Sequence, residues 1–148
     1  MMTLVAQKSA PAAEQQHEGN CINAINRLKQ KIQASGALVS STRFYEEPSP
    51  NNPFKEGISI SLILGTRDPA DPANLKNNQL MNSTPTQIHL AESVFDDCPE
   101  VVSLGFLMSR TSWTKRIFRS VDQTAIPGRC IAAARGIEWP EWGSYSCP

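Results

Sequence analysis

The spacing of the apolar residues changes from a helical to an alternating pattern early in the chain, and this change restricts the fold more than any other feature. The apolar residues of the first patterned segment recur three or four positions apart: Cys21, Ile22, Ile25, Leu28 and Ile32. This spacing places them on one face of a helix, and lysine, arginine, asparagine and glutamine side chains cover the remainder. Asn20 is a good N-cap and Gly36 supplies the left-handed stop, so we expect one amphipathic helix over residues 21–35.

A two-residue period follows, and this period is typical of strands. Residues 58–64 alternate most cleanly, with isoleucine and leucine on one face and serine on the other, and we expect the serine face to lie near water. Residues 38–45 alternate in the same way, and a proline-rich loop separates the two segments. The same reasoning predicts further strands over residues 86–91, 101–108, 113–121 and 129–134.

The connections contain their own local signals. Asp71 followed by Pro72 matches an N-cap and a first helical position, which predicts a short helix ending near Met81. Residues 96–99 are expected to form a turn between two strands, and Pro127–Gly128 is expected to form the turn of a hairpin.

These elements predict an α+β fold in which one N-terminal amphipathic helix packs on a mainly antiparallel sheet of about five strands. A chain of 148 residues is long enough for one compact domain and too short for two ordinary ones. The segment before the helix is small, polar and interrupted by proline. We therefore expect residues 1–19 to be flexible and residues 20–148 to form a single domain.

The charge balance excludes long-range electrostatic steering onto nucleic acid or an anionic membrane, because 14 basic residues cancel 14 acidic ones. A mean hydropathy of -0.33 gives no indication of a membrane span, so no membrane partner is expected. The first residues contain no apolar stretch of the length of a secretion signal. We therefore expect a cytoplasmic protein of the bacterial type, with its four cysteines reduced and mostly buried.

Catalytic signatures are absent or defective, so we favour a protein that is not an enzyme. The segment from His17 to Cys21 resembles a zincin helix, but cysteine replaces the second histidine and a glycine and an asparagine interrupt it. We therefore expect no metal and no cofactor. For thiol catalysis the weak candidates are Cys130, which follows Arg129, and His89, which is expected in a strand. A lone cysteine followed by isoleucine and alanines is more often a small buried hydrophobe, so we favour a structural role for Cys130.

The basic stretch, residues 110–135, is the most informative local feature. Between residues 109 and 136 six residues are basic and one is acidic. Basic and aromatic side chains interleave there, and those that could hold phosphates or stack on bases are Arg110, Trp113, Lys115, Arg116, Phe118, Arg119 and Arg129. The alternative is a pair of strands whose arginines are solvated or pair with nearby carboxylates.

The C-terminal segment contains three large aromatic side chains within seven residues, Trp139, Trp142 and Tyr145. Aromatic residues are enriched at protein interfaces, and Pro140 stiffens this segment. The segment is therefore expected either to contact another protein or a second copy, or to fold back and close the domain's own core.

By elimination, the sequence predicts a non-enzymatic binding or regulatory protein that acts through protein–protein contacts, including self-association. Single-stranded nucleic-acid binding through the basic stretch is the first alternative, and a small thiol-dependent enzyme is the second.

Overall fold

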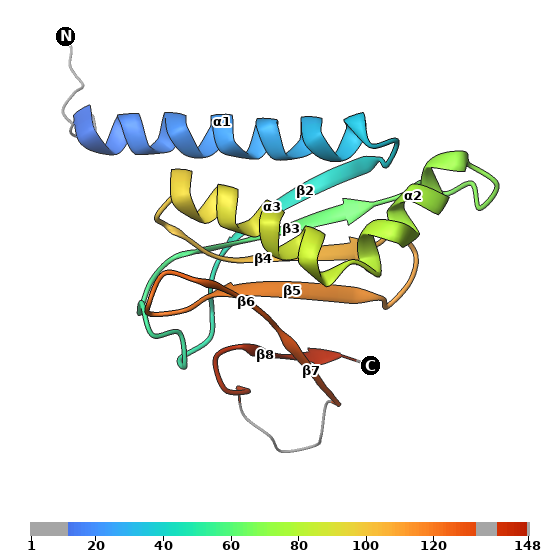
Figure 1. The fold of residues 1–148 in the computed structure, drawn as a ribbon. Helices are drawn as coiled ribbons and strands as arrows, with labels where there is room; N and C mark the ends of the chain where they lie inside the picture. The colour runs from blue at the N-terminus through green and yellow to red at the C-terminus, as the bar shows by residue number, and fades with distance from the viewer. Residues whose placement is uncertain (1–11, 133–138, 148) are drawn as a thin grey trace, which may run out of the picture.

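The computed structural model describes residues 12–132 and 139–147, and it shows three helices and two sheets. The elements in chain order are α1 (Ala12–Ala34), β2 (Val39–Glu46), β3 (Ile58–Leu64), α2 (Pro72–Met81), α3 (Thr84–Asp97), β4 (Val101–Met108), β5 (Thr114–Arg119), β6 (Ala125–Pro127), β7 (Arg129–Ala132) and β8 (Ser144–Cys147). Figure 1 shows the helices on one side of the larger sheet and the β7–β8 pair on the other.

The larger sheet has the order β2-β3-β4-β5-β6. Only the central pair, β3 and β4, is parallel, and α2 and α3 form the crossover that a parallel connection requires. The other three pairs are antiparallel. The prediction of an α+β fold with a mainly antiparallel sheet of about five strands is confirmed.

The hydrophobic core lies between this sheet and the helices. Leu28 and Ile32 of α1 and Leu90 and Val94 of α3 pack against alternate residues of the central strands, such as Phe106. Apolar side chains that repeat every three or four residues on a helix and every second residue on a strand can share one core in this way. No helix in the described part of the chain is both long enough and apolar enough to cross a membrane.

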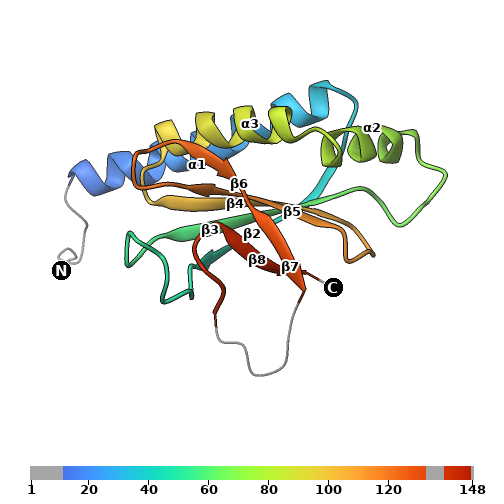
Figure 2. The ribbon, with the colours of Figure 1, turned by 60° about the horizontal axis from the view of Figure 1, so that its bottom comes forward.

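The opposite face of the sheet is covered by the C-terminal segment. Strands β7 and β8 pair in parallel and run beneath β5, as the rotated view in Figure 2 also shows. The helical face is covered by three helices, whereas this face is covered by two strands of four residues each.

Several local predictions are confirmed. The strands predicted near residues 38–45, 58–64, 101–108 and 113–121 are present as β2, β3, β4 and β5, and β7 forms within residues 129–134. The side chain of Asp71 accepts a hydrogen bond from the backbone N–H of Ala73 and caps α2, which has proline in its first turn.

Other predictions are wrong. Residues 86–91 belong to α3, because Ser83 caps a helix that starts with Thr84–Pro85 and buries Gln87, Leu90 and Val94 at helical spacing. The predicted turn at residues 96–99 therefore holds the end of α3. Helix α1 begins at Ala12 rather than after Asn20. The hairpin turn lies between β5 and β6, where Ser120 N–H donates to the Thr124 carbonyl, and not at Pro127–Gly128.

The prediction of four reduced cysteines is also wrong in this structure. Cys21 in α1 is bonded to Cys98 at the end of α3, and Cys130 in β7 is bonded to Cys147 in β8. The paired residues are 77 and 17 positions apart, so local sequence could not reveal either partner.

Candidate functional site

A line of polar side chains crosses the sheet on the face that the C-terminal segment covers. Arg116 Nη1 donates to Ser103 Oγ at 2.6 Å, Ser103 Oγ lies 2.6 Å from Ser59 Oγ, and Ser59 Oγ donates to Glu47 Oε1 at 2.6 Å. Since Ser59 donates its single proton to Glu47, Ser103 must donate to Ser59. Two serine hydroxyls thus link the positive charge of Arg116 to the negative charge of Glu47.

The prediction that the serine face of residues 58–64 lies near water is wrong for Ser59, which is buried, whereas Ser61 is half-buried. Ser59 and Ser103 are fully buried, and Ser61 accepts a hydrogen bond from Arg116 Nη2 at 2.7 Å. Arg116 Nη2 also donates to the Tyr45 hydroxyl at 2.9 Å. Four strands therefore meet at one guanidinium, which an alternating sequence pattern cannot show.

Gly105 makes room for this guanidinium. The register of β4 and β5 places Gly105 directly opposite Arg116. A Cβ atom at residue 105 would lie 2.5 Å from Arg116 Nη2 and 2.8 Å from Cζ. Only a residue without a side chain allows the guanidinium to lie across β4 and reach the serines of β3 and β4.

The C-terminal segment is held over this face by hydrogen bonds to both ends of β5 and from the β2–β3 loop. Trp142 Nε1 donates to the Arg119 carbonyl at 2.8 Å, and the Trp142 ring meets Phe118 edge-on with centroids 4.8 Å apart. The Tyr145 hydroxyl donates to the Thr114 carbonyl at 2.9 Å. Asn51 Nδ2 of the β2–β3 loop donates to the carbonyls of Trp139 and Pro140.

A cavity of about 190 Å³ remains between the C-terminal segment, the β2–β3 loop and the sheet. Its lining includes Arg116, the aromatic residues Tyr45, Trp139, Trp142 and Tyr145, and the acidic residues Glu47 and Glu141. Trp139 is 50% exposed and Tyr45 is 40% exposed, so two of these rings face solvent at the mouth. We refer to this feature as the arginine cavity.

The electrostatics of the arginine cavity depend on burial as well as on charge. Burial raises the pKa of Tyr145, and the nearby positive charge of Arg116 opposes that shift. Within the described residues the only side-chain ion pair is Arg27–Asp97, so no carboxylate lies within 4.0 Å of Arg116 there. Its charge is balanced through hydroxyl groups instead of by direct contact with an acid.

The nucleic-acid candidates do not gather on one surface. Arg119 is buried on the helical side, where it donates to the carbonyls of Val101, Phe95 and Cys98. Burial lowers the pKa of Arg119, and Asp96 and Glu100 oppose the shift. Its role is to hold the end of α3 against β5.

The other members of this candidate set are also separated. Arg116 and Lys115 are neighbours in β5 and therefore point to opposite faces. Arg110 lies in the turn after β4, and Arg129 donates weakly to Ser144 from β7.

The aromatic candidates are separated as well: Trp113 packs against the core, and Phe118 contacts Trp142. The pattern of alternating basic and aromatic residues thus divides between two faces.

The thiol-catalysis candidates do not form a site. Cys130 is bonded to Cys147 and carries no thiolate in this structure. His89 is exposed on α3, which lies on the other side of the sheet from β7. The predicted pair therefore cannot act together.

Comparisons with models of protein families, with curated proteins and with solved structures found no match in any of the three. The sequence pointed to Arg116 and to the three aromatic residues of the C-terminal segment, but not to Gly105, which leaves room for the guanidinium, or to the polar residues of the site, which are Tyr45, Glu47, Asn51, Ser59, Ser61 and Ser103. The serine alternation of residues 58–64 was the only signal that pointed to them.

Proposed function

We propose that this protein is a non-enzymatic binding protein that recognises a carboxylate next to an aromatic or apolar side chain on a partner protein, using the arginine cavity. The observation that carries the proposal is the presence of Arg116 in a cavity lined by aromatic rings, without a carboxylate in contact with it in the described part of the chain. Arginine forms shorter and stronger hydrogen bonds with a carboxylate than with neutral hydroxyls.

The donor count of Arg116 supports this ligand. A guanidinium has five N–H groups, and three of them donate to Ser103, Tyr45 and Ser61. Among the described residues no acceptor is found for the Nε proton and one Nη1 proton, so each can donate one hydrogen bond to a ligand. Glu47 and Glu141 also line the cavity, but among the described residues neither lies within 4.0 Å of Arg116, and the two oxygens of Glu47 accept from Ser59 Oγ and from the backbone N–H of Ser49.

The size of the cavity supports a protein partner rather than a cofactor. A volume of about 190 Å³ is below the range of about 300–1,000 Å³ that is usual for drug-sized ligands, and it suits one side chain or a chain terminus. Trp139 is the aromatic residue of the C-terminal segment that is most available to a partner, whereas Trp142 and Tyr145 already donate to the domain's own backbone.

The experiment uses N-acetyl-L-phenylalanine and its amide as probes, with binding followed by the indole N–H signals of the three tryptophans in ¹H–¹⁵N spectra. We expect the carboxylate to shift the Trp139 signal in a saturable way and the amide to bind at least tenfold more weakly. Trp139→Ala should weaken binding about tenfold, whereas the control Val121→Ala, an exposed apolar residue of the β5–β6 turn, should leave it unchanged. Equal binding of acid and amide, or saturation unaffected by Trp139→Ala, would overturn the proposal.

The compartment is part of this proposal. A cytoplasmic location was expected from the absence of an apolar leader, but stable disulfides form mainly in oxidising compartments. The two disulfides therefore favour an oxidising compartment over the cytoplasm, and thiol titration of the protein trapped with acid directly from its native cells distinguishes the two.

A further inference from the structure

The disulfide between Cys21 and Cys98 lies in the wall of an apolar groove on the helical side of the sheet. The groove has a volume of about 460 Å³ and lies between α1 and strands β2 and β3. Its rim carries Ile22 and Phe44, which are 62% and 60% exposed. Cys98 is buried and Cys21 is half-buried, so the pair can be reached through the groove from the side of Cys21.

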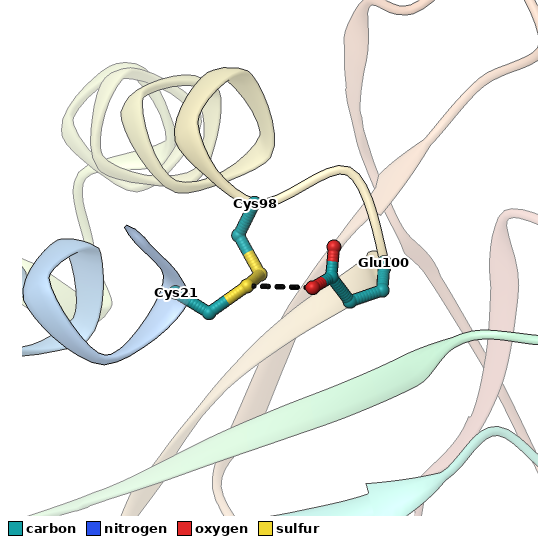
Figure 3. A group of neighbouring side chains, drawn as sticks. All are labelled: Cys21, Cys98 and Glu100. Carbon is teal, nitrogen blue, oxygen red and sulfur yellow. Dashed lines mark hydrogen bonds between the residues drawn. A yellow bond between two sulfur atoms is a disulfide. The ribbon is translucent and has the colours of Figure 1, made fainter. Parts of the chain in front are cut away.

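A carboxylate is directed at this disulfide. Figure 3 shows Glu100 with its side chain turned toward the two sulfurs, and its Oε1 lies 3.0 Å from Cys21 Sγ. The ligand atoms of Cys21, Cys98 and Glu100 all lie within 4.8 Å of one another. A disulfide sulfur has no proton to donate, so the carboxylate gains no conventional hydrogen bond from this position.

The electrostatic surroundings of Glu100 favour a cation. An adjacent cleft is lined by four glutamates, Glu46, Glu47, Glu56 and Glu100, and by one lysine, Lys55. Cys98 is the C-cap of α3, where the helix dipole is negative. The opposing positive charges are Arg119, which donates to the Phe95 and Cys98 carbonyls, and Lys29 on the far wall of the groove.

These observations lead us to propose that the reduced protein binds one zinc ion through the thiolates of Cys21 and Cys98 and the carboxylate of Glu100. Two sulfurs and one oxygen form a donor set that zinc accepts, and three protein ligands leave a fourth position for water or for a ligand. Among the residues that the structure describes, this is the one group of three or more such side chains that lie close enough together.

Zinc and the disulfide exclude each other, so the oxidation state of the protein controls the site. A dithiol reductant transfers two electrons and two protons to the Cys21–Cys98 bond, which opens to two thiols while the reductant becomes a disulfide. Zinc then displaces the two thiol protons into solvent and binds the thiolates. The oxidised protein has no thiolate to offer at this position.

The test compares the full-length chain in its oxidised form and after reduction with a phosphine that is then removed under argon. Zinc content is measured by elemental analysis after gel filtration, and Co²⁺ is used as a spectroscopic probe for thiolate-to-metal charge-transfer bands. We expect about one zinc per reduced chain, none per oxidised chain, and cobalt bands typical of two thiolates in a tetrahedral site.

Variants identify the ligands. Cys21→Ser should abolish stoichiometric binding, and Glu100→Gln, which leaves both cysteines in place, should weaken zinc binding at least tenfold. The matched control is the double variant Cys130→Ser with Cys147→Ser, which removes the other disulfide and should still bind one zinc after reduction.

Circular dichroism of each sample measures its helix content, because reduction of the disulfides can partly unfold the chain. A reduced chain that loses helix and regains it when zinc is added supports the proposal. A reduced chain that binds no zinc, folded or not, overturns it. Binding that survives Cys21→Ser, or that disappears in the Cys130 and Cys147 control, overturns it as well.

Discussion

The two faces of the five-stranded sheet are stabilised by different kinds of contact. On the helical face Leu28, Leu90 and Phe106 are buried among other apolar side chains, and the buried polar residues Gln87 and Arg119 donate hydrogen bonds to backbone carbonyls at the ends of α2 and α3. On the other face Arg116 and the buried serines are held by short hydrogen bonds. Each covering layer is closed by one disulfide, Cys21–Cys98 over the helical face and Cys130–Cys147 under the polar face.

If the proposed function is correct, this difference separates stability from recognition on the two faces of one sheet. An apolar core tolerates the replacement of one apolar side chain by another of similar volume. Many different sequences can therefore form the helical face. The polar face depends on register, because Arg116 reaches its partners only where Gly105 lies opposite it. Stability is therefore expected to depend mostly on the helical face, and ligand specificity on the polar face.

Removing the two disulfides gives the largest expected losses of stability in the two layers. The chain-entropy relation predicts a loss of about 4.5 kcal/mol for the Cys21–Cys98 bond, which spans 77 residues, and about 3 kcal/mol for the Cys130–Cys147 bond, which spans 17. Double serine variants of each pair are compared by urea unfolding. A larger loss from the Cys130–Cys147 pair would show that the polar layer, and not the helical layer, limits stability.

Truncating one large side chain on each face gives the next contrast. Phe106→Ala removes a fully buried ring and should lower the free energy of unfolding by about 3 to 5 kcal/mol. Trp142→Ala removes a half-buried ring and one hydrogen bond to the Arg119 carbonyl, and about 2 kcal/mol is expected. Both values come from urea midpoints at equal slope. Equal losses would contradict the proposed division between the faces.

A double-mutant cycle at Gly105 and Arg116 tests the directional contacts alone. Gly105→Ala should cost about 1 to 2 kcal/mol, because the new Cβ displaces the guanidinium from Ser61 and Ser103. In the background of Arg116→Ala the same change should cost little, since nothing remains to be displaced. Additive costs for the two changes would mean that Gly105 is required by the backbone and not by Arg116.

Most features with local determinants could be predicted from the sequence. The alternation of residues 58–64 and the Asp71 cap of α2 involve neighbours in the chain, and both predictions are confirmed. Residues 86–91 are the exception, because the strand predicted there is a helix that the Ser83 hydroxyl caps and in which Leu90 and Val94 recur at helical spacing. These determinants are local as well, so distant contacts do not explain this error.

The candidate site was less predictable, because its members come from different strands. Arg116 was selected for its charge, but its partners Ser61 and Tyr45 lie 55 and 71 positions away and meet it only through the strand order β2-β3-β4-β5. The serines were expected to be solvated because no residue near them in the sequence suggested a buried cation. The disulfide partner of Cys21 was hidden for the same reason.

The smallest expected effect concerns Asp122, which lies in the exposed β5–β6 turn and belongs to neither layer. The side chains of Ser120 and Thr124 and the Thr124 backbone N–H donate to its carboxylate and lower its pKa from 3.8 to about 2. Because the pKa is depressed in the folded state, the stabilisation is fully present above about pH 4 and is lost as the pH falls through about 2.

Titration of the Asp122 carboxyl ¹³C signal is expected to give a midpoint near 2. Asp122→Asn should be slightly less stable than the parent protein at pH 7, and this difference should shrink between about pH 4 and pH 2. Since the carboxylate is fully exposed, the effect should remain local and appear as faster amide exchange at Thr124, without a change at Phe106 or Arg116. An acid-induced change at Phe106 or Arg116 with the same midpoint would show that the β5–β6 turn is energetically coupled to one of the two layers. That result would contradict the expectation that Asp122 belongs to neither layer.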